Sequence, residues 1–295
     1  MTRPRDNRDR IVSVSVAGRI ADARRHPEPV LPGDDGEISF LPGAGGVVLG
    51  VHAGDPVDRS VGDHLMPGAG IEDAEAGPAD PGSLHLLACI GNPVRDGRGA
   101  FLGVVSGKRG GLAPSAFAPN LVSVEASEDR LRELVPGDRV VLEAEGRGLG
   151  LVDHPGVALS NSSPRLLDAL PLEERDRGLH VSVRTVVPSR FAGPGLGQDA
   201  WIGDVEILSD GAADPRPDDL RFGDLVAFED VDSAHGRFYR PGFVSVGIVS
   251  HGPSRSAGHG PGVTIVLSGP AHDVTCEVSP DAATGALLRA WAEDG

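Results

Sequence analysis

The sequence predicts a mainly β protein of the α+β class, with two β-rich halves of barrel or sandwich type and a few short helices. Glycine and proline contribute 42 and 25 of the 295 residues, which favours many short strands joined by tight turns. Apolar residues make up 39% of the chain but aromatic residues only 4%, so we expect a core of valine, leucine, isoleucine and alanine. Alternating or apolar runs recur along the chain, most of them bounded by glycine, proline, aspartate or asparagine.

These runs are the predicted strands, because period-two alternation places every second side chain on one face of a sheet. The clearest alternation is IVSVSVAG, at residues 11–18. The other predicted strands, in chain order, are residues 45–52, 84–90, 100–107, 120–126, 138–146, 179–187, 224–230, 242–250 and 262–269.

Each predicted helix begins at a serine that can cap the first turn, and two of them have proline at the first helical position. The capping residues are Ser127, Ser163 and Ser279. The helices that they open are SEDRLREL (127–134), SPRLLDAL (163–170) and SPDAATGALLRAWAED (279–294).

A weak internal sequence similarity bears on the domain organisation. LVPGDRVVLEA (134–144) and LRFGDLVAFED (220–230) both place a Gly-Asp turn before a strand, although such turns are also common before unrelated strands. We therefore predict an N-terminal β-rich domain at residues 1–160 and a C-terminal β-rich domain at residues 161–295.

Composition excludes several classes of partner. The formal net charge is −16 and the pI is about 4.9, and an acidic surface repels nucleic-acid phosphates. No apolar run is long enough to span a membrane or to form a signal peptide. Cys89 and Cys276 form no CxxC pattern, and Cys89 is interpreted as a buried apolar residue. We expect a cytoplasmic, bacterial protein that binds neither nucleic acid nor membrane, and the sequence leaves a homo-oligomer open.

The first candidate site is the loop GDHLMPGAGI (62–71), in which Asp63 and His64 are adjacent. Such a pair can supply a metal ligand, a general base or hydrogen bonds. Neighbouring residues of a strand point to opposite faces, so both reach one site only if this segment is a loop. A solvated turn is the alternative.

The second candidate contains Lys108, the only lysine of the chain, in the glycine-rich segment RDGRGAFLGVVSGKRGG (95–111). Lysine can lose its proton and act as a base or nucleophile, whereas arginine cannot. Gly107, Arg109 and Gly110 are predicted to bind substrate, because glycine loops free backbone N–H groups for an anion. A lysine left by chance in a surface turn is the alternative.

The third candidate is SHGPSRSAGHGPGVTIVLSG (250–269), whose His251 and His259 a hairpin loop can bring together. Rigid glycines, Gly258 and Gly260, flank the second imidazole and are predicted to bind substrate. A surface hairpin histidine is the alternative.

A further segment, GPGLGQDAWIGDVEI (193–207), places Asp204 and Glu206 on one face of a strand. Both residues can bind a cation or exchange a proton, although in so acidic a chain a solvated acidic face is the expectation. We assign Asp204 alone to substrate binding.

The chain resembles a family of uncharacterised bacterial and archaeal proteins, domain of unknown function 4438. The resemblance covers nearly the whole chain and implies a shared site without assigning a reaction. The family has GKHGG where this chain has GKRGG, so Arg109 replaces a histidine, and GDYDI where this chain has GDVEI, so Glu206 replaces an aspartate. The resemblance depends on LPGAGGVVLGVHAGD (41–55), GDHLMPGAGI, LACIGN (87–92), GVVSGKRGG (103–111), RFGDLVAFED (221–230) and GIVSHGPSRSAGHGPGVT (247–264).

The sequence favours an enzyme that acts on a small polar metabolite by acid–base chemistry at a carbonyl or amide centre, as a hydrolase or lyase. No cofactor is required, and a divalent metal on His64, His251 and His259 is compatible with the spacing. The alternative is a non-catalytic protein that binds a small molecule or takes part in an assembly. The predicted catalytic residues are Lys108, His259, His251, His64 and Asp63.

Overall fold

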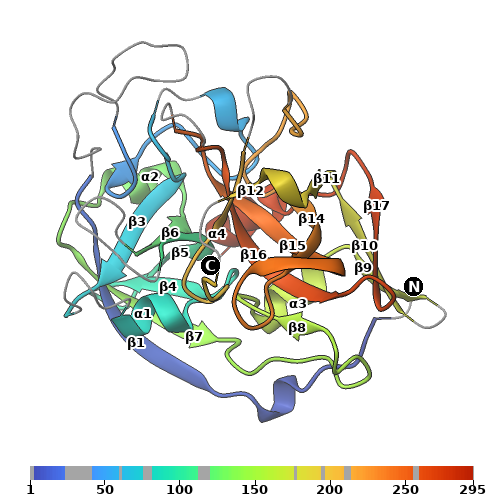
Figure 1. Ribbon diagram of the computed structural model, residues 1–295. Coiled ribbons are helices and arrows are strands. Elements are labelled where there is room, and N and C mark those ends of the chain that lie inside the picture. The colour runs from blue at the N-terminus through green and yellow to red at the C-terminus, as the bar shows by residue number, and fades with distance from the viewer. Residues whose placement is uncertain are drawn as a thin grey trace.

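The computed structural model describes residues 3–23, 42–59, 62–75, 82–111, 120–175, 178–193, 197–208, 214–254 and 259–294. Over these residues the protein is mainly β, as the composition predicts, with a closed barrel, a curled half-barrel sheet and four α-helices. Figure 1 shows the barrel and the half-barrel side by side.

The barrel is formed by the N-terminal half of the chain. Its strands follow the order β1-β7-β4-β5-β6-β3, and β3 pairs back with β1, from Gly18 opposite Asp73 to Ile20 opposite Ile71, which closes the ring. The strands are β1 (Ser13–Ile20), β3 (Gly68–Asp73), β4 (Pro93–Asp96), β5 (Phe101–Arg109), β6 (Leu121–Glu125) and β7 (Arg139–Glu145), with β2 (Val47–Val48) added to β3.

The half-barrel is formed by the C-terminal half, in the order β11-β14-β15-β16-β13-β12, with β8 paired to β16. Its strands are β8 (Ala158–Leu159), β11 (Thr185–Pro188), β12 (Ala192–Gly193), β13 (Val205–Ile207), β14 (Leu225–Asp232), β15 (Phe238–His251) and β16 (Gly262–Pro270). A separate small sheet contains β9 (Leu172–Arg175), β10 (Gly178–Val183) and β17 (Val274–Val278).

The four helices of the described residues are short. They are α1 (Gly82–Leu87), α2 (Glu128–Arg132), α3 (Pro164–Ala169) and α4 (Gly285–Glu293). Two serine caps are confirmed, because Ser127 accepts a hydrogen bond from the backbone of Arg130 and Ser163 accepts one from Leu166. None of the described helices combines the length and the apolar character that crossing a membrane requires.

The predicted strand at residues 84–90 is wrong, because this segment begins with helix α1. A short apolar run fits a buried strand or a buried helix equally well, so periodicity alone does not separate them. The helix is capped from a distance, since the side chain of Asp73 accepts a hydrogen bond from the backbone N–H of Leu84 at 3.1 Å. That cap comes from strand β3, which a local pattern does not show.

Other boundaries also differ from the prediction. The segment 45–52 contributes only β2, and 179–187 divides into β10 and β11. The last helix begins at Gly285 and not after Ser279. The intervening backbone pairs with the start of β14, where Leu225 N donates to Ala282 O at 3.0 Å and Thr284 N donates to Gly223 O at 2.7 Å. Those backbone groups are therefore not available to a helix.

The two Gly-Asp turns fold alike. Gly137 and Gly223 have φ angles of 91° and 90°, a left-handed region that favours glycine. The carboxylates of Asp138 and Asp224 each accept a hydrogen bond at 2.9 Å from the backbone N–H three residues earlier. Each turn leads into a central strand of its half, β7 or β14.

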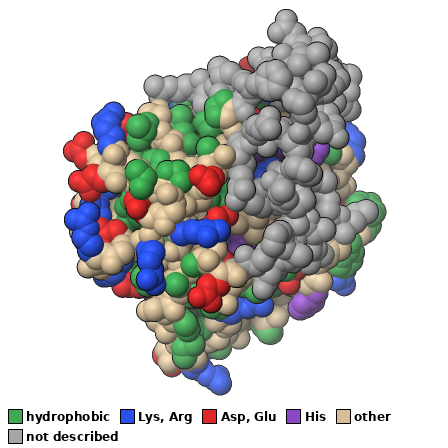
Figure 2. Space-filling view, turned by 90° about the vertical axis from the view of Figure 1, so that its left-hand side faces the viewer, with side chains coloured by type: hydrophobic (Ala, Val, Ile, Leu, Met, Phe, Trp, Pro, Cys, Tyr) green, Lys and Arg blue, Asp and Glu red, His purple; other side chains and the backbone are tan. Residues whose placement is uncertain are grey.

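Strand β5 joins the halves, because it packs against β15 and β16 of the half-barrel and also against the C-terminal helix α4, which lies on β5 and β6. The main core is continuous across this junction and consists of valine, leucine, isoleucine and alanine side chains. On the described part of the face in Figure 2, basic and acidic side chains are interspersed and no basic stripe is present.

Candidate functional site

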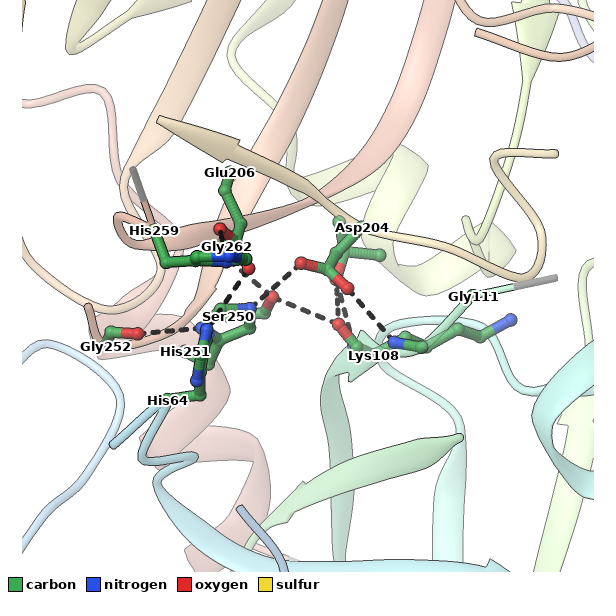
Figure 3. A network of polar contacts seen from close by, with 12 residues as sticks. His64, Lys108, Gly111, Asp204, Glu206, Ser250, His251, Gly252, His259 and Gly262 are labelled. Carbon is green, nitrogen blue, oxygen red and sulfur yellow. Dashed lines mark hydrogen bonds and ion pairs between the residues drawn. The ribbon is translucent and has the colours of Figure 1, made fainter. Parts of the chain in front are cut away.

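A cluster of histidines and carboxylates lies where the end of β5 meets the half-barrel. Glu206 of β13 and His251 of β15 both lie opposite Gly262, the first residue of the strand between them. A Cβ atom at Gly262 would lie 1.9 Å from His251 Nε2, so only glycine leaves room for this imidazole. Figure 3 shows His64, His251 and His259 gathered around Glu206, with Asp204 beside them.

His251 and Asp204 form a buried pair. His251 Nδ1 lies 2.8 Å from the carbonyl oxygen of Gly252, and Nε2 lies 2.9 Å from Asp204 Oδ2. Because a carbonyl only accepts, Nδ1 carries a proton and donates it, which directs Nε2 toward the carboxylates. A histidine held through one ring N–H in this way is typical of metal sites, where the other nitrogen faces the ion.

Glu206 is approached by two imidazoles. Its Oε2 accepts from His259 Nδ1 at 2.8 Å, and its Oε1 lies 3.3 Å from His64 Nε2. His64 is only 6% exposed, and its Nε2 has no hydrogen-bond partner in the described part of the chain. The His64 ring centroid lies 5.3 Å from that of His251 and 5.6 Å from that of His259. A buried ring nitrogen directed at a carboxylate without a hydrogen bond is a candidate ligand atom.

The backbone of His64 explains how neighbouring residues reach one site. Its φ angle is 53°, a left-handed value that is uncommon outside glycine, and its N–H donates to Pro253 O at 3.1 Å. This turn lets the Asp63 carboxylate also lie near the imidazole, with Oδ1 3.4 Å from His64 Nδ1. The same carboxylate accepts a hydrogen bond from Ser254 Oγ, which ties the loop to the end of β15.

Charge pairing shifts the titration of the cluster. Burial acts to raise the pKa of Glu206, but His259 and His64 more than offset it, so this pKa lies well below its usual value. The pKa of Asp204 is also lowered. Burial acts to raise it, but the charge and hydrogen bond of His251, together with the charge of Arg109, have the larger combined effect. The pKa of His259 is raised, chiefly by its hydrogen bond to Glu206. Both carboxylates therefore remain ionised at neutral pH, as ligands of a cation must be.

Within the described ranges, two groups of side chains could hold a metal ion. One is His64, Glu206 and His259, and the other is Asp204, Glu206 and His251. Within each group the candidate ligand atoms all lie within 4.8 Å of one another, and Glu206 belongs to both. Three nitrogen and oxygen ligands with space for a further ligand are typical of catalytic zinc and related divalent ions.

Lys108 does not direct its ammonium at this cluster. Its backbone faces the site instead, since Lys108 N donates to Thr264 Oγ1 at 2.9 Å and Lys108 O accepts from Ser250 Oγ at 3.2 Å (Figure 3). The side chain is 1% exposed, and Nζ donates to Trp201 O at 3.1 Å. Burial lowers the pKa of this amine to about 7. The site therefore brings together the other predicted catalytic residues, Asp63 and the three histidines. The Lys108 side chain lies elsewhere, against Trp201.

Arg109 lies on the cluster side of β5. Its positive charge acts to lower the pKa of both His64 and Asp204, and it forms no ion pair within the described residues. The backbone N–H of Gly110, which was predicted to bind substrate, donates to Asp204 Oδ1 at 3.0 Å. This donor is therefore already used within the protein.

The remaining predicted glycines allow close packing. A Cβ at Gly107 would lie 2.3 Å from Ser250 Cβ, and one at Gly260 would lie 1.7 Å from Ile207 O. These glycines hold β5, β13, β15 and the loop before β16 in contact. Gly258 lies outside the described residues.

The expectation that Asp204 and Glu206 form a solvated acidic face is wrong, because their side chains are only 8% and 7% exposed. Glu206 is buried against strand β16 and the loop that carries His64. The i,i+2 spacing with Asp204 was the available signal, since both carboxylates do point to one side of β13. What the spacing did not reveal is that three histidines from other segments meet them there.

Comparison with known proteins agrees with this architecture. A family model described as domain of unknown function (DUF4438), N-terminal, matches residues 32–168, and its C-terminal counterpart matches residues 169–288. The solved structure described as "Crystal structure of TM1086" is 34% identical, with a TM-score of 0.87, and the match covers 97% of this chain and 100% of that chain. No curated protein matches.

The fold and the two matched regions therefore define a two-part β protein of a family without an assigned reaction. The chain belongs to the DUF4438 family.

Proposed function

We propose that the protein is a metal-dependent cytoplasmic enzyme that acts on a small polar metabolite by acid–base chemistry at a carbonyl or amide centre, as a hydrolase or lyase. The observation that carries the proposal is His64 Nε2. Among the residues that the structure describes, this buried nitrogen has no hydrogen-bond partner, and it points at Glu206, 3.3 Å away, beside His259. A buried polar atom without a partner is destabilising, and a divalent ion between these side chains would satisfy it.

The donor set indicates the kind of ion. Imidazole nitrogens with a carboxylate favour zinc or another divalent transition metal over calcium or magnesium, which prefer oxygen ligands. His64, Glu206 and His259 would hold the ion, which when bound supplies Lewis-acid polarisation of a carbonyl oxygen.

The proposal assigns proton transfer to the His251–Asp204 pair. His251 Nδ1 is fixed by the carbonyl of Gly252, and Nε2 shares a hydrogen bond with Asp204. The proton that lies between Nε2 and Asp204 Oδ2 is the mobile one, so the pair would donate this proton to a reacting group and take it back in a later step. Asp63 orients His64 from the opposite side.

Arg109 is the residue that favours an anionic or amide-bearing substrate. The nearby backbone N–H groups are occupied, because Gly110 N donates to Asp204 and Gly111 N donates to Asn120 Oδ1 at 2.9 Å. The guanidinium of Arg109 forms no ion pair within the described ranges, and it is available to bind a substrate oxygen.

The first test measures metal content by mass spectrometry after purification without chelators, in the wild type and in His64→Ala. The expected result is about one divalent transition metal per chain in the wild type and a loss of most of it in the variant. His154→Ala is the matched control, because His154 also pairs with a glutamate, at 3.3 Å from Glu174, outside the cluster. Equal metal content in all three proteins, or none after reconstitution with zinc, manganese and iron, would contradict the metal site.

The second test separates catalysis from binding. The metal-loaded protein is assayed against a panel of small esters, amides, lactones and hydroxy acids, with Asp204→Asn as the comparison. Turnover that falls at least tenfold in Asp204→Asn while metal content is retained supports the enzyme. Metal binding without turnover of any compound in the panel would instead favour a non-catalytic binding protein.

A further inference from the structure

A second candidate site lies where the loops of the barrel and the half-barrel meet. It is a cavity of about 520 Å3, and none of its lining residues belongs to the histidine–carboxylate cluster. Small-molecule sites usually have volumes of about 300–1,000 Å3, so the cavity is large enough for a metabolite. Its walls come from Arg147, Gly148, Leu149, Gly150, Val157, Ala158, Leu159, Asp199, Trp201, Ala234 and His235.

Two basic side chains, Arg147 and His235, line this cavity in a chain whose net charge is −16, and the buried Lys108 lies behind its Trp201 wall. The guanidinium of Arg147 lies over the Trp201 ring, 4.2 Å from its centroid, and forms no ion pair with any described residue. The buried ammonium of Lys108 lies 5.6 Å from the same ring centroid. His235 is exposed at the rim and has no side-chain hydrogen bond to another described residue.

Of the described lining residues, Asp199 alone is acidic, and it forms no ion pair with Arg147 or His235. Asp199 Oδ1 accepts a hydrogen bond from Trp201 N at 3.0 Å, which holds the tryptophan loop in place. The rest of the wall is apolar, with Leu149 and Leu159 buried. The cavity therefore combines an aromatic and aliphatic wall with a cation that has no acidic partner.

We propose that this cavity binds a small organic anion, whose apolar body lies against Trp201 and Leu149 and whose anionic group contacts Arg147 and His235. Arginine forms strong charge-assisted hydrogen bonds with carboxylates and phosphates. Its position on the tryptophan ring also restricts the guanidinium before a ligand arrives, which reduces the entropy lost on binding. The proposal is independent of the metal centre, because the two sites share no residue.

Benzoate is the probe, since it joins a carboxylate to a flat apolar ring, and benzyl alcohol is the uncharged compound of similar shape. Binding is measured by calorimetry on the full chain up to about 10 mM, roughly ten times a millimolar dissociation constant. We expect benzoate to bind, and Arg147→Gln to weaken its binding at least tenfold. Benzyl alcohol is expected to bind at least tenfold more weakly than benzoate.

Arg165→Gln is the matched control, because Arg165 lies over the other tryptophan, Trp291, at 4.4 Å and does not line the cavity. Its benzoate affinity should equal that of the wild type. In a Trp291→Phe variant, Trp201 is the only tryptophan left. Benzoate should change the fluorescence of Trp201, and the dissociation constant from this titration should equal the one from calorimetry. Absence of benzoate binding, equal binding by Arg147→Gln, or binding without any change in Trp201 fluorescence would overturn the proposal.

Discussion

Replacing Lys108 with methionine should stabilise the protein, and the gain should depend on pH. Lys108 is 1% exposed, and burial lowers the pKa of its amine from 10.5 to about 7. At about 1.4 kcal/mol per pH unit, this shift corresponds to a penalty of about 5 kcal/mol for the charged amine in the folded state. Methionine has a similar volume and no charge, but it loses the hydrogen bond to Trp201 O, which contributes about 1 kcal/mol.

The sign of the pH dependence follows from the lowered pKa. Below about pH 7 the amine is protonated in both the folded and the unfolded chain, so the folded state carries the whole penalty. Between about pH 7 and 10.5 only the unfolded chain is protonated, and the penalty declines as pH rises. Lys108→Met should therefore exceed the wild type by about 4 kcal/mol in free energy of unfolding at about pH 6, and by less than about 1 kcal/mol at about pH 10.

Urea denaturation of both proteins at several pH values measures this difference, and effects of the histidine–carboxylate cluster cancel because they are common to both chains. Lys108→Arg is the control, since arginine keeps its charge and is larger, so this variant should be less stable than the wild type throughout. A Lys108→Met variant that is less stable than the wild type at about pH 6, or a difference between the two proteins that does not change with pH, would show that the buried amine carries no such charge penalty.

Three further substitutions test individual parts of the fold. Gly262→Ala forces a Cβ to within 1.9 Å of His251 Nε2, so the imidazole must move and the free energy of unfolding should fall by about 1–3 kcal/mol in urea denaturation. Ser163→Ala removes the cap of helix α3 and should lower the same free energy by about 1 kcal/mol in urea denaturation, against no change for an exposed serine. Asn161→Ala removes the two buried hydrogen bonds that its amide donates to Ala200 O and Ile265 O, and it should destabilise the protein by about 2 kcal/mol or more, seen as a lower melting temperature.

Strand positions could be predicted because alternation is a local property. Residues 11–18, 100–107, 120–126, 138–146 and 262–269 all lie largely within strands. Helix α1 could not be predicted, since its apolar run has no period that separates a helix from a strand, and its cap comes from Asp73 on another element. The same holds for the start of α4, which depends on pairing between residues 279–284 and β14.

The candidate site was predictable as a set of segments but not as a geometry. The histidines and the Asp63–His64 pair were recognisable, because glycine-rich loops that carry imidazoles are uncommon in plain turns. Which side of β5 each residue faces depends on how the barrel packs against the half-barrel. Lys108 and Arg109 are neighbours, and alternation along the strand directs one toward Trp201 and the other toward the cluster.

The packing of α4 on the barrel has a consequence for biosynthesis. The ribosome completes the strands of the barrel at Glu145, but the helix that covers β5 and β6 begins only at Gly285. The apolar surface that later receives Leu288 and Ala292 therefore stays uncovered while nearly half of the polypeptide is still being translated. Nascent chains that stop before Gly285 would expose this apolar surface to chaperones and to one another. A truncation that removes only helix α4 should therefore aggregate and accumulate in inclusion bodies.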